Sequence, residues 1–321
     1  MGEFELIRHY FAAAPCAQAR EEVALGIGDD CALLALPPGE QMAISTDTLV
    51  TGVHFPEVCD PFLLGQRALA VSASDLAAMG ARPVGFTLAL TLPSVDIDWL
   101  EAFAFGLSRM AQHCSLSLIG GDTTRGPLSL TLTVFGGVPA GLALTRSGAR
   151  EGDLLCVGGA LGDAAGALPL VLRERNAEPS VAEPLLARYW SPQPQLALGQ
   201  ALRGKATSAL DISDGLLADC GHIAHASGVR LLIERDTVPM SAELLTLFDT
   251  QSARQKALSG GDDYVLAFTL PPVHLAALLE ADWPVHVIGR VVSGQGVALI
   301  DGDGQDVTPS TRGYQHFRGG S

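Results

Sequence analysis

The chain has 321 residues, 48% of them apolar, which is long enough for two domains that each bury a hydrophobic core. A formal net charge of −15 and the lack of any run of Lys and Arg exclude a protein that binds the phosphate backbone of a nucleic acid. We expect no membrane segment and no signal peptide, and six scattered cysteines without a C-x-x-C pair favour buried thiols in the cytoplasm.

The first half of the chain carries alternating helix and strand signals. Phe4, Ile7 and Phe11 recur at helical spacing and predict a short N-terminal helix. Beyond it, the apolar patterns predict strands at 41–46, 84–92 and 128–136 and helices at 61–79 and 96–114. The turn-rich segment 138–153 then indicates a domain junction.

The second half has less regular alternation. We expect strands at 153–159, 207–212, 229–234, 264–268, 285–291 and 296–300. Helices are expected near 162–173, 183–188, 194–202, 214–227 and 272–281. This order predicts two α+β domains, residues 1–140 and 141–321, instead of one doubly wound sheet.

Acidic residues with Gly, Ser or Thr neighbours recur at predicted strand ends and turns. They are Asp29 and Asp30 in GIGDD, Asp47 in STDT, Asp75 in SASDLAAMG, Asp122 in GGDTTRG, and Asp211 and Asp214 in DISDG. One such Asp alone is more often a turn residue or a helix cap than a ligand. Their recurrence favours hard divalent cations such as Mg²⁺, which prefer carboxylate and other oxygen ligands.

Two of these stretches have further features. Asp75 lies in an otherwise apolar helix, where a buried carboxylate is costly unless it is paired or bound to a cation. In GGDTTRG the glycines would let backbone amides approach phosphate oxygens, although a tight turn between strands uses the same residues. Arg146 could hold a phosphate, but its spacing alone is more typical of a surface Arg.

Other nucleotide and catalytic motifs are absent. GQALRGKA, at 199–206, approaches a P-loop, but it ends in Ala206 and follows a predicted helix instead of a strand. No G-x-S-x-G motif and no Cys/His or His/Glu set with zinc spacing is present.

Seven motifs in chain order resemble those of the bacterial thiamine-monophosphate kinases, over essentially the whole chain: GIGDDCALL, STDTLVTGVHF, ALAVSASDLAAMGA, LIGGDTTRGP, ALTRSGA, DISDGLLADCGHI and LSGGDDY. The wider superfamily, which resembles aminoimidazole-ribonucleotide synthetase, binds ATP without a P-loop. The resemblance implies a two-domain fold and a homodimer formed through strands of the N-terminal domain. It also implies ATP-dependent phosphorylation of thiamine monophosphate to thiamine diphosphate, the last step of that cofactor's biosynthesis, with several Mg²⁺ ions.

The same resemblance assigns roles to individual residues. Positions that bind Mg²⁺ in the family correspond to Asp30, Ser45, Thr46, Asp47, Asp75, Asp122, Asp211 and Asp214. ATP-contacting positions correspond to Gly121, Asp122, Arg146 and Ser213. The thiamine-phosphate side corresponds to His54, Asp262 and Tyr314. The family usually has GGED where this chain has GGDD, so the Asp262 side chain is one methylene shorter.

Two alternatives remain at this point. One is a related ATP-using synthetase of the selenophosphate or hydrogenase-maturation type. It is disfavoured because Cys16 lies in AAAPCAQAR without a Gly-rich loop and because the tail HFRGGS has no Cys. The other is a non-catalytic protein that binds nucleotides or cations.

Overall fold

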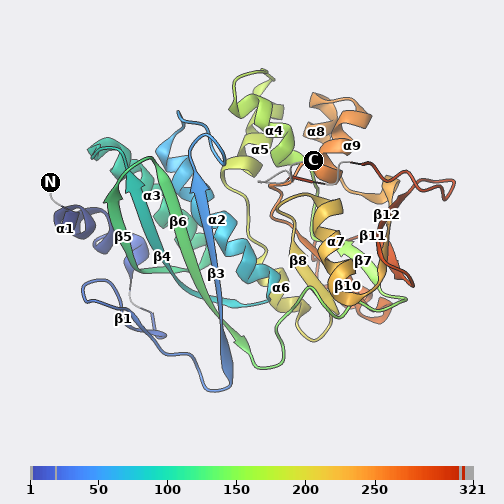
Figure 1. Ribbon diagram of the computed structural model, residues 1–321, viewed down its shortest axis with the longest axis horizontal. Coiled ribbons are helices and arrows are strands. Elements are labelled where there is room, and N and C mark those ends of the chain that lie inside the picture. Colours follow the sequence, from blue (N-terminus) through green and yellow to red (C-terminus); the bar gives the residue numbers. More distant parts are fainter. Residues whose placement is uncertain (1–2, 19, 311–312, 315–321) are drawn as a thin grey trace, which may run out of the picture. The chain divides into compact units, whose positions relative to one another are not determined.

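The computed structural model describes residues 3–18, 20–310 and 313–314, which form two compact units (Figure 1). The first unit comprises Met1–Leu76, Ala81–Ala143 and Trp190–Leu196, and the second comprises Ala77–Gly80, Leu144–Tyr189 and Ala197–Ser321. Two short segments thus belong to the unit of the other half of the chain, Ala77–Gly80 to the second and Trp190–Leu196 to the first, and the division into domains 1–140 and 141–321 stays a prediction. Residues 315–321, which follow Tyr314 and end in GGS, lie outside the described residues. None of the described helices is both long and apolar enough to cross a membrane.

The first unit is built on a mixed four-stranded sheet. Its order is β3 (Glu40–Val50), β6 (Ser129–Pro139), β4 (Arg82–Leu92) and β5 (Ser117–Arg125), with β4 and β5 parallel and the other neighbours antiparallel. Helices α2 (Pro61–Ala78) and α3 (Ile97–Cys114) lie on one face of it (Figure 1). These helices pack backbone to backbone, since a Cβ on Gly106 would lie 1.9 Å from the Phe62 carbonyl oxygen.

Two expectations about local structure are corrected in this unit. The residues GGDTT, which read as a possible turn, lie inside strand β5 and pair with β4. Asp47, placed at a strand end by the sequence pattern, lies inside β3, which extends to Val50. Partner strands on the sheet decide the conformation of both segments more strongly than the turn preferences of their residues.

The GIGDD sequence forms the loop of a small hairpin. Strand β1 (Val23–Leu25) pairs with β2 (Leu33–Leu34), and the sequence patterns did not predict either strand. Arg82 of β4 bonds to Glu22 beside β1 and to Glu40 of β3, which ties the base of the hairpin to the sheet. The predicted N-terminal helix is present as α1 (Glu3–Leu6), continued by a π-helix over Ile7–Ala12 and followed by a 3₁₀ turn at Pro15–Ala17.

The second unit contains a mixed six-stranded sheet. Its order is β12 (Gly296–Ile300), β9 (Arg230–Glu234), β11 (His286–Val292), β7 (Leu154–Val157), β10 (Leu266–Leu270) and β8 (Ser208–Asp211). Strands β12 and β9 run parallel, whereas the other neighbouring pairs are antiparallel. The expected helices of this half are present as α4 (Asp163–Val171), α5 (Pro179–Trp190), α6 (Leu196–Leu202), α7 (Leu216–Ser227) and α10 (Leu275–Glu280). Short 3₁₀ turns lie at Arg235–Thr237 and Pro272–His274. Helix α8 (Ala242–Leu247), like α9 (Thr250–Ser259), was not expected.

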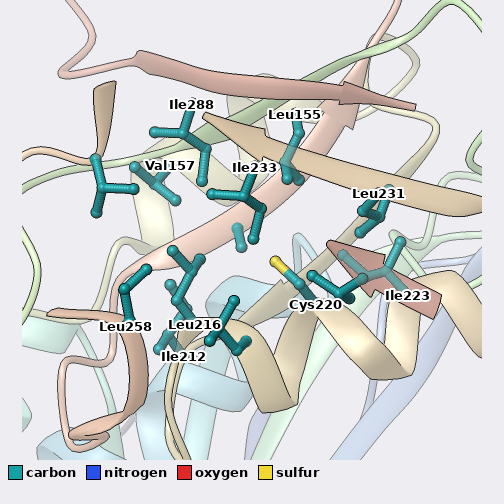
Figure 2. Close-up of a cluster of buried hydrophobic side chains, with 14 of the residues drawn as sticks. Leu155, Val157, Ile212, Leu216, Cys220, Ile223, Leu231, Ile233, Leu258 and Ile288 are labelled. Carbon is teal, nitrogen blue, oxygen red and sulfur yellow. The ribbon is translucent and has the colours of Figure 1, made fainter. Parts of the chain in front are cut away.

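The core of the second unit anchors its functional loops. Figure 2 shows Leu216, Cys220 and Ile223 of α7 packed toward the strands. Ile212, directly after β8, is fully buried in the same cluster. The DISDG segment therefore leaves the core at Ile212 and returns to it at Leu216.

The cysteines agree with the expectation of free thiols, but they are not all buried. All six are free. Cys31 is exposed and Cys59 is half-buried, while the other four are buried. Burial raises the pKa of the Cys114 and Cys156 thiols to about 12, which is typical of inert core cysteines.

Candidate active site

A first polar group in the first unit joins strand β3 to helix α2. Ser45 and Asp47 share the helix-covered face of β3, and Ser45 Oγ donates a short hydrogen bond to Asp75 Oδ2. Ser72, one turn before Asp75, bonds to the Asp47 carboxylate. Burial, followed by the charge of Asp75, raises the pKa of Asp47 to about 6. Two half-buried carboxylates thus lie near each other at the junction of β3 and α2.

Thr46 does not join this group through its side chain. Its Oγ1 lies 2.9 Å from Thr133 Oγ1 on the open face of the sheet, and Thr48 Oγ1 lies 2.9 Å from Thr131 Oγ1 on the same face. Alternate residues of a strand point to opposite faces, so Ser45 and Asp47 face the helices while Thr46 faces away.

A second group surrounds a cleft of about 1070 Å³ in the same unit. The cleft lies between the GIGDD loop, the Ile7–Ala12 helix and strand β5, and Asp30, Gly121 and Asp122 line it together with Asp29. Gly121 has φ of 152°, and a Cβ there would lie 2.0 Å from the Leu88 carbonyl oxygen. Only glycine therefore lets β5 lie so close to β4 at this point.

Asp122 is well separated from Asp47 within one chain. Cross-strand pairing aligns Asp122 with Thr48 through Ala89 and Thr131, so Asp122 lies on the open face. Strands β3 and β5 form opposite edges of the sheet, and three strand spacings place their backbones about 14 Å apart. One chain does not bring these two predicted ligands to the same ion.

The third group is the turn between β8 and α7 in the second unit. Asp211 ends β8 and is buried. The backbone amides of Ser213, Asp214 and Gly215 each donate to Asp219 Oδ2 over 3.0 Å. Burial raises the pKa of Asp219 to about 6, against the lowering effect of these hydrogen bonds.

The GGDD segment docks against this same turn. The Asp262 amide donates to the Ser213 carbonyl over 2.8 Å, and the Tyr264 amide donates to the Ile212 carbonyl over 2.8 Å. Gly261 has φ of 71°, and a Cβ there would lie 2.5 Å from the Ser213 carbonyl oxygen. The Tyr264 hydroxyl bonds to Asp262 Oδ1 over 3.0 Å, which orients that carboxylate.

Tyr314 reaches the turn from the C-terminal segment. Its amide donates to the Asp214 carbonyl over 3.0 Å, while its side chain is exposed. Ser213, Asp214, Asp262 and Tyr314 come from three distant stretches of sequence, and the structure brings all of them to one turn. Four of the residues assigned to the ATP, Mg²⁺ and thiamine sides therefore lie together at this turn.

The remaining predicted residues lie elsewhere. Arg146 is exposed, and its carbonyl oxygen accepts from Ser227 Oγ over 3.3 Å. In the first unit, His54 lies in the turn after β3, where its Nδ1 accepts from the Val50 amide over 3.0 Å. That acceptor role leaves the proton of a neutral imidazole on Nε2.

The predicted ligand set does not assemble into one metal centre in this chain. Among the residues that the structure describes, no three His, Cys, Asp or Glu side chains lie close enough together to hold a metal ion. Mg²⁺ commonly takes one or two carboxylates and completes its shell with waters and substrate phosphates. The Asp47–Asp75 pair fits that mode, because a cation would stabilise the buried Asp47 charge and offset its repulsion by Asp75, the two causes that raise the pKa of Asp47.

Two buried carboxylates near the site were not singled out in the sequence. Asp219 lies within the quoted motif DISDGLLADCGHI, four residues after Gly215 in the first turn of α7. An acidic residue there is a recognisable signal for binding free amides at a helix N-terminus. Asp263 accepts from the Gly162 amide over 2.8 Å, and burial raises its pKa well above the usual range. No sequence pattern distinguishes Asp263 from Asp262.

Comparisons with known proteins match both units. Residues 28–138 match the family described as AIR synthase related protein, N-terminal domain, and residues 150–302 match its C-terminal domain. A thiamine-monophosphate kinase of Salmonella typhimurium is 48% identical over 98% of each chain. A crystal structure of the thiamine-monophosphate kinase from Stenotrophomonas maltophilia K279a is 44% identical, with a TM-score of 0.84 over 94% of this chain and 96% of that one. The structure of AaThiL complexed with AMPPCP and TMP is 30% identical, with a TM-score of 0.80 over 88% and 89%.

Proposed function

Because this chain belongs to the thiamine-monophosphate kinase family, we propose that it transfers the γ-phosphoryl group of ATP directly to the phosphate of thiamine monophosphate. The products are thiamine diphosphate and ADP. A phosphate oxygen of thiamine monophosphate forms the new bond to the γ-phosphorus. The bond from the γ-phosphorus to the β,γ-bridging oxygen breaks, and ADP leaves with its electron pair.

The observation that carries this proposal is the meeting of two residue sets at the turn between β8 and α7. Ser213 and Asp214 belong to the ATP and Mg²⁺ side, whereas Asp262 and Tyr314 belong to the thiamine side. Direct transfer needs both reactants held together in line, with the reacting atoms in near contact. A turn that fixes residues from both sets supports that arrangement.

The carboxylates are proposed to act by binding Mg²⁺, and the transfer forms no covalent intermediate with the protein. The attacking phosphate oxygen is already ionised near neutral pH, because the second pKa of a phosphate monoester is about 6, so no strong general base is needed. Asp47 and Asp75, with Ser45, would hold one Mg²⁺ in the first unit, and Asp30, Thr46, Asp122, Asp211 and Asp214 are the other proposed ligands. When bound, Mg²⁺ would reduce the repulsion between the anionic reactants.

The side chain of Asp262 is proposed to face the organic cation. Thiamine carries a permanently charged thiazolium, and a carboxylate is a suitable partner for it. The hydrogen bond from the Tyr264 hydroxyl orients the Asp262 carboxylate, and the exposed ring of Tyr314 offers an aromatic face for stacking. His54, Gly121 and Arg146 keep their assigned roles as proposals.

A homodimer through the first unit is the proposed assembly. The open face of the four-stranded sheet carries exposed Met42 and Ile44 on its edge strand β3. No strand among the described residues pairs with the outer edge of β3, which is 11 residues long. Long open edges are usually covered, and we propose a second copy of the chain as the cover. The cytoplasmic location also stays a prediction.

The test is an incubation of the purified protein with ATP, Mg²⁺ and thiamine monophosphate. Equal amounts of thiamine diphosphate and ADP are expected, and unphosphorylated thiamine should give neither. Asp47→Asn and Asp75→Asn variants should fold but lose turnover. ATP binding without product would support a binding protein instead, and near-normal turnover in either variant at saturating Mg²⁺ would contradict the ligand assignment.

A further inference from the structure

Three consecutive peptide units in the turn between β8 and α7 form hydrogen bonds through both their N–H and their C=O groups. Their amides, on Ser213, Asp214 and Gly215, all donate to Asp219 Oδ2 over 3.0 Å. A trans peptide directs its N–H and its C=O to opposite sides. The carbonyls of these same units therefore point away from Asp219.

Each of the three carbonyls accepts from the substrate-side segments. The Ile212 carbonyl accepts from the Tyr264 amide over 2.8 Å, and the Ser213 carbonyl accepts from the Asp262 amide over 2.8 Å. The Asp214 carbonyl accepts from the Tyr314 amide over 3.0 Å. Every peptide unit that Asp219 holds by its N–H is thus bonded by its C=O to a segment on the proposed thiamine side.

We propose that Asp219 is a positioning residue that sets the orientation of these three peptide units and so couples the ATP side of the site to its thiamine side. This inference rests on the proposed function. Asp219 need not touch either substrate for this role. It fixes the backbone that carries Ser213 and Asp214, and through the three carbonyls it fixes the positions of Asp262 and Tyr314.

The chemistry of Asp219 suits this task. Its side chain is 4% exposed, so water does not compete strongly for the three amides. A carboxylate oxygen is a stronger acceptor than a neutral one, and hydrogen bonds in a chain strengthen one another. Polarising each N–H strengthens the C=O of the same unit as an acceptor. Loss of the carboxylate should therefore weaken the hydrogen bonds at both the N–H and the C=O of each of these three peptide units.

A simple helix-capping role would have a different signature. A cap that only stabilises α7 would lower the melting temperature and leave the affinity for both substrates unchanged in the folded fraction. Asp153 provides a matched control in the same unit. It is 5% exposed and accepts from the Arg150 amide over 2.9 Å and from the Thr207 hydroxyl over 2.6 Å, away from the turn.

The experiment compares Asp219→Asn, Asp219→Ala and Asp153→Asn by steady-state kinetics, thermal unfolding and amide hydrogen exchange. Asp219→Ala should lower kcat/KM for ATP and for thiamine monophosphate together, each by roughly ten- to a hundredfold. Asp219→Asn, which keeps one neutral acceptor, should fall between it and the unmodified chain. Exchange should speed up at Ser213–Gly215 and also at Asp262 and Tyr264.

Asp153→Asn should lower the melting temperature yet keep kcat and both KM values within about twofold. The proposal is overturned if the Asp219 variants keep both KM values, if only one substrate is affected, or if exchange at Asp262 and Tyr264 is unchanged. If the unmodified chain makes no thiamine diphosphate, the proposed function fails, while the exchange data still decide whether Asp219 orders the turn.

Discussion

The backbone amide of Asp262 donates a 2.8 Å hydrogen bond to the carbonyl oxygen of Ser213. Asp262 has φ of 63°, an unusual conformation for a residue other than glycine. The GGDD segment is therefore held in an unfavourable backbone shape by its contact with the DISDG turn. Such strain is common where a side chain must be aimed at a ligand.

The Asp262 carboxylate should determine affinity for thiamine monophosphate. Asp262→Asn removes its charge and should raise KM for that substrate about tenfold or more, while KM for ATP changes little. Tyr264→Phe is the matched control, since it removes the hydroxyl bonded to Asp262 and keeps the charge, and its effect should be smaller. Equal effects on the two KM values in Asp262→Asn would place the carboxylate outside the thiamine side.

Gly121 should be required for the structure of the first unit. Gly121→Ala would place a Cβ 2.0 Å from the Leu88 carbonyl oxygen at φ of 152°, so the unfolding free energy should fall by about 1–3 kcal/mol. Gly120→Ala is the control, because its Cβ would meet only Thr87 Cγ2 at 3.6 Å. Urea unfolding of both variants measures the difference. Equal stability of the two variants would contradict the close approach of β5 to β4.

Asp47 should make the metal-free protein less stable as the pH rises. Its folded pKa of about 6 exceeds the ordinary pKa of 3.8 for an Asp side chain, so the folded state binds the proton more tightly. The favourable contribution of the protonated group is complete below pH 4 and is lost as the pH rises through 6, by roughly 3 kcal/mol at most. Urea unfolding in EDTA, compared with Asp47→Asn across this range, measures it.

The result with Mg²⁺ follows from the same charge. At pH 7, added Mg²⁺ should restore stability to the unmodified protein, since a ligand that binds only the folded state stabilises it. Asp47→Asn should gain less. A pH dependence identical in the two proteins would contradict the assigned environment of Asp47.

Ile44 should lie in the proposed dimer interface. It is 60% exposed in the single chain, and Ile44→Lys should yield a monomer in sedimentation experiments. Val58→Lys is the control, because Val58 is 82% exposed and lies outside the sheet. The interface is wrong if the unmodified protein is a monomer or if Ile44→Lys remains a dimer.

Long periodic segments were predictable from the sequence alone. The helix expected at 61–79 is α2 over Pro61–Ala78, and the strand expected at 296–300 is β12 over Gly296–Ile300. Their apolar patterns report local burial directly. The family and its activity followed from the ordered motifs, and the comparisons confirm both.

The arrangement of the site was not predictable in the same way. Asp47 and Asp122 occur in similar local patterns, yet strand order and register place them on opposite faces and opposite edges of one sheet. The role of Asp219 depends on backbone amides, which have no side-chain pattern. Both features arise from long-range pairing, which local spacing does not encode.

Direct phosphoryl transfer is the central claim, and ATP labelled with ³²P in the γ-phosphate tests it most directly. After incubation with Mg²⁺ and thiamine monophosphate, the label should appear in the terminal phosphate of thiamine diphosphate, with none on the protein during turnover. Label released as inorganic phosphate without thiamine diphosphate, or label retained on the protein as an intermediate, would contradict the account.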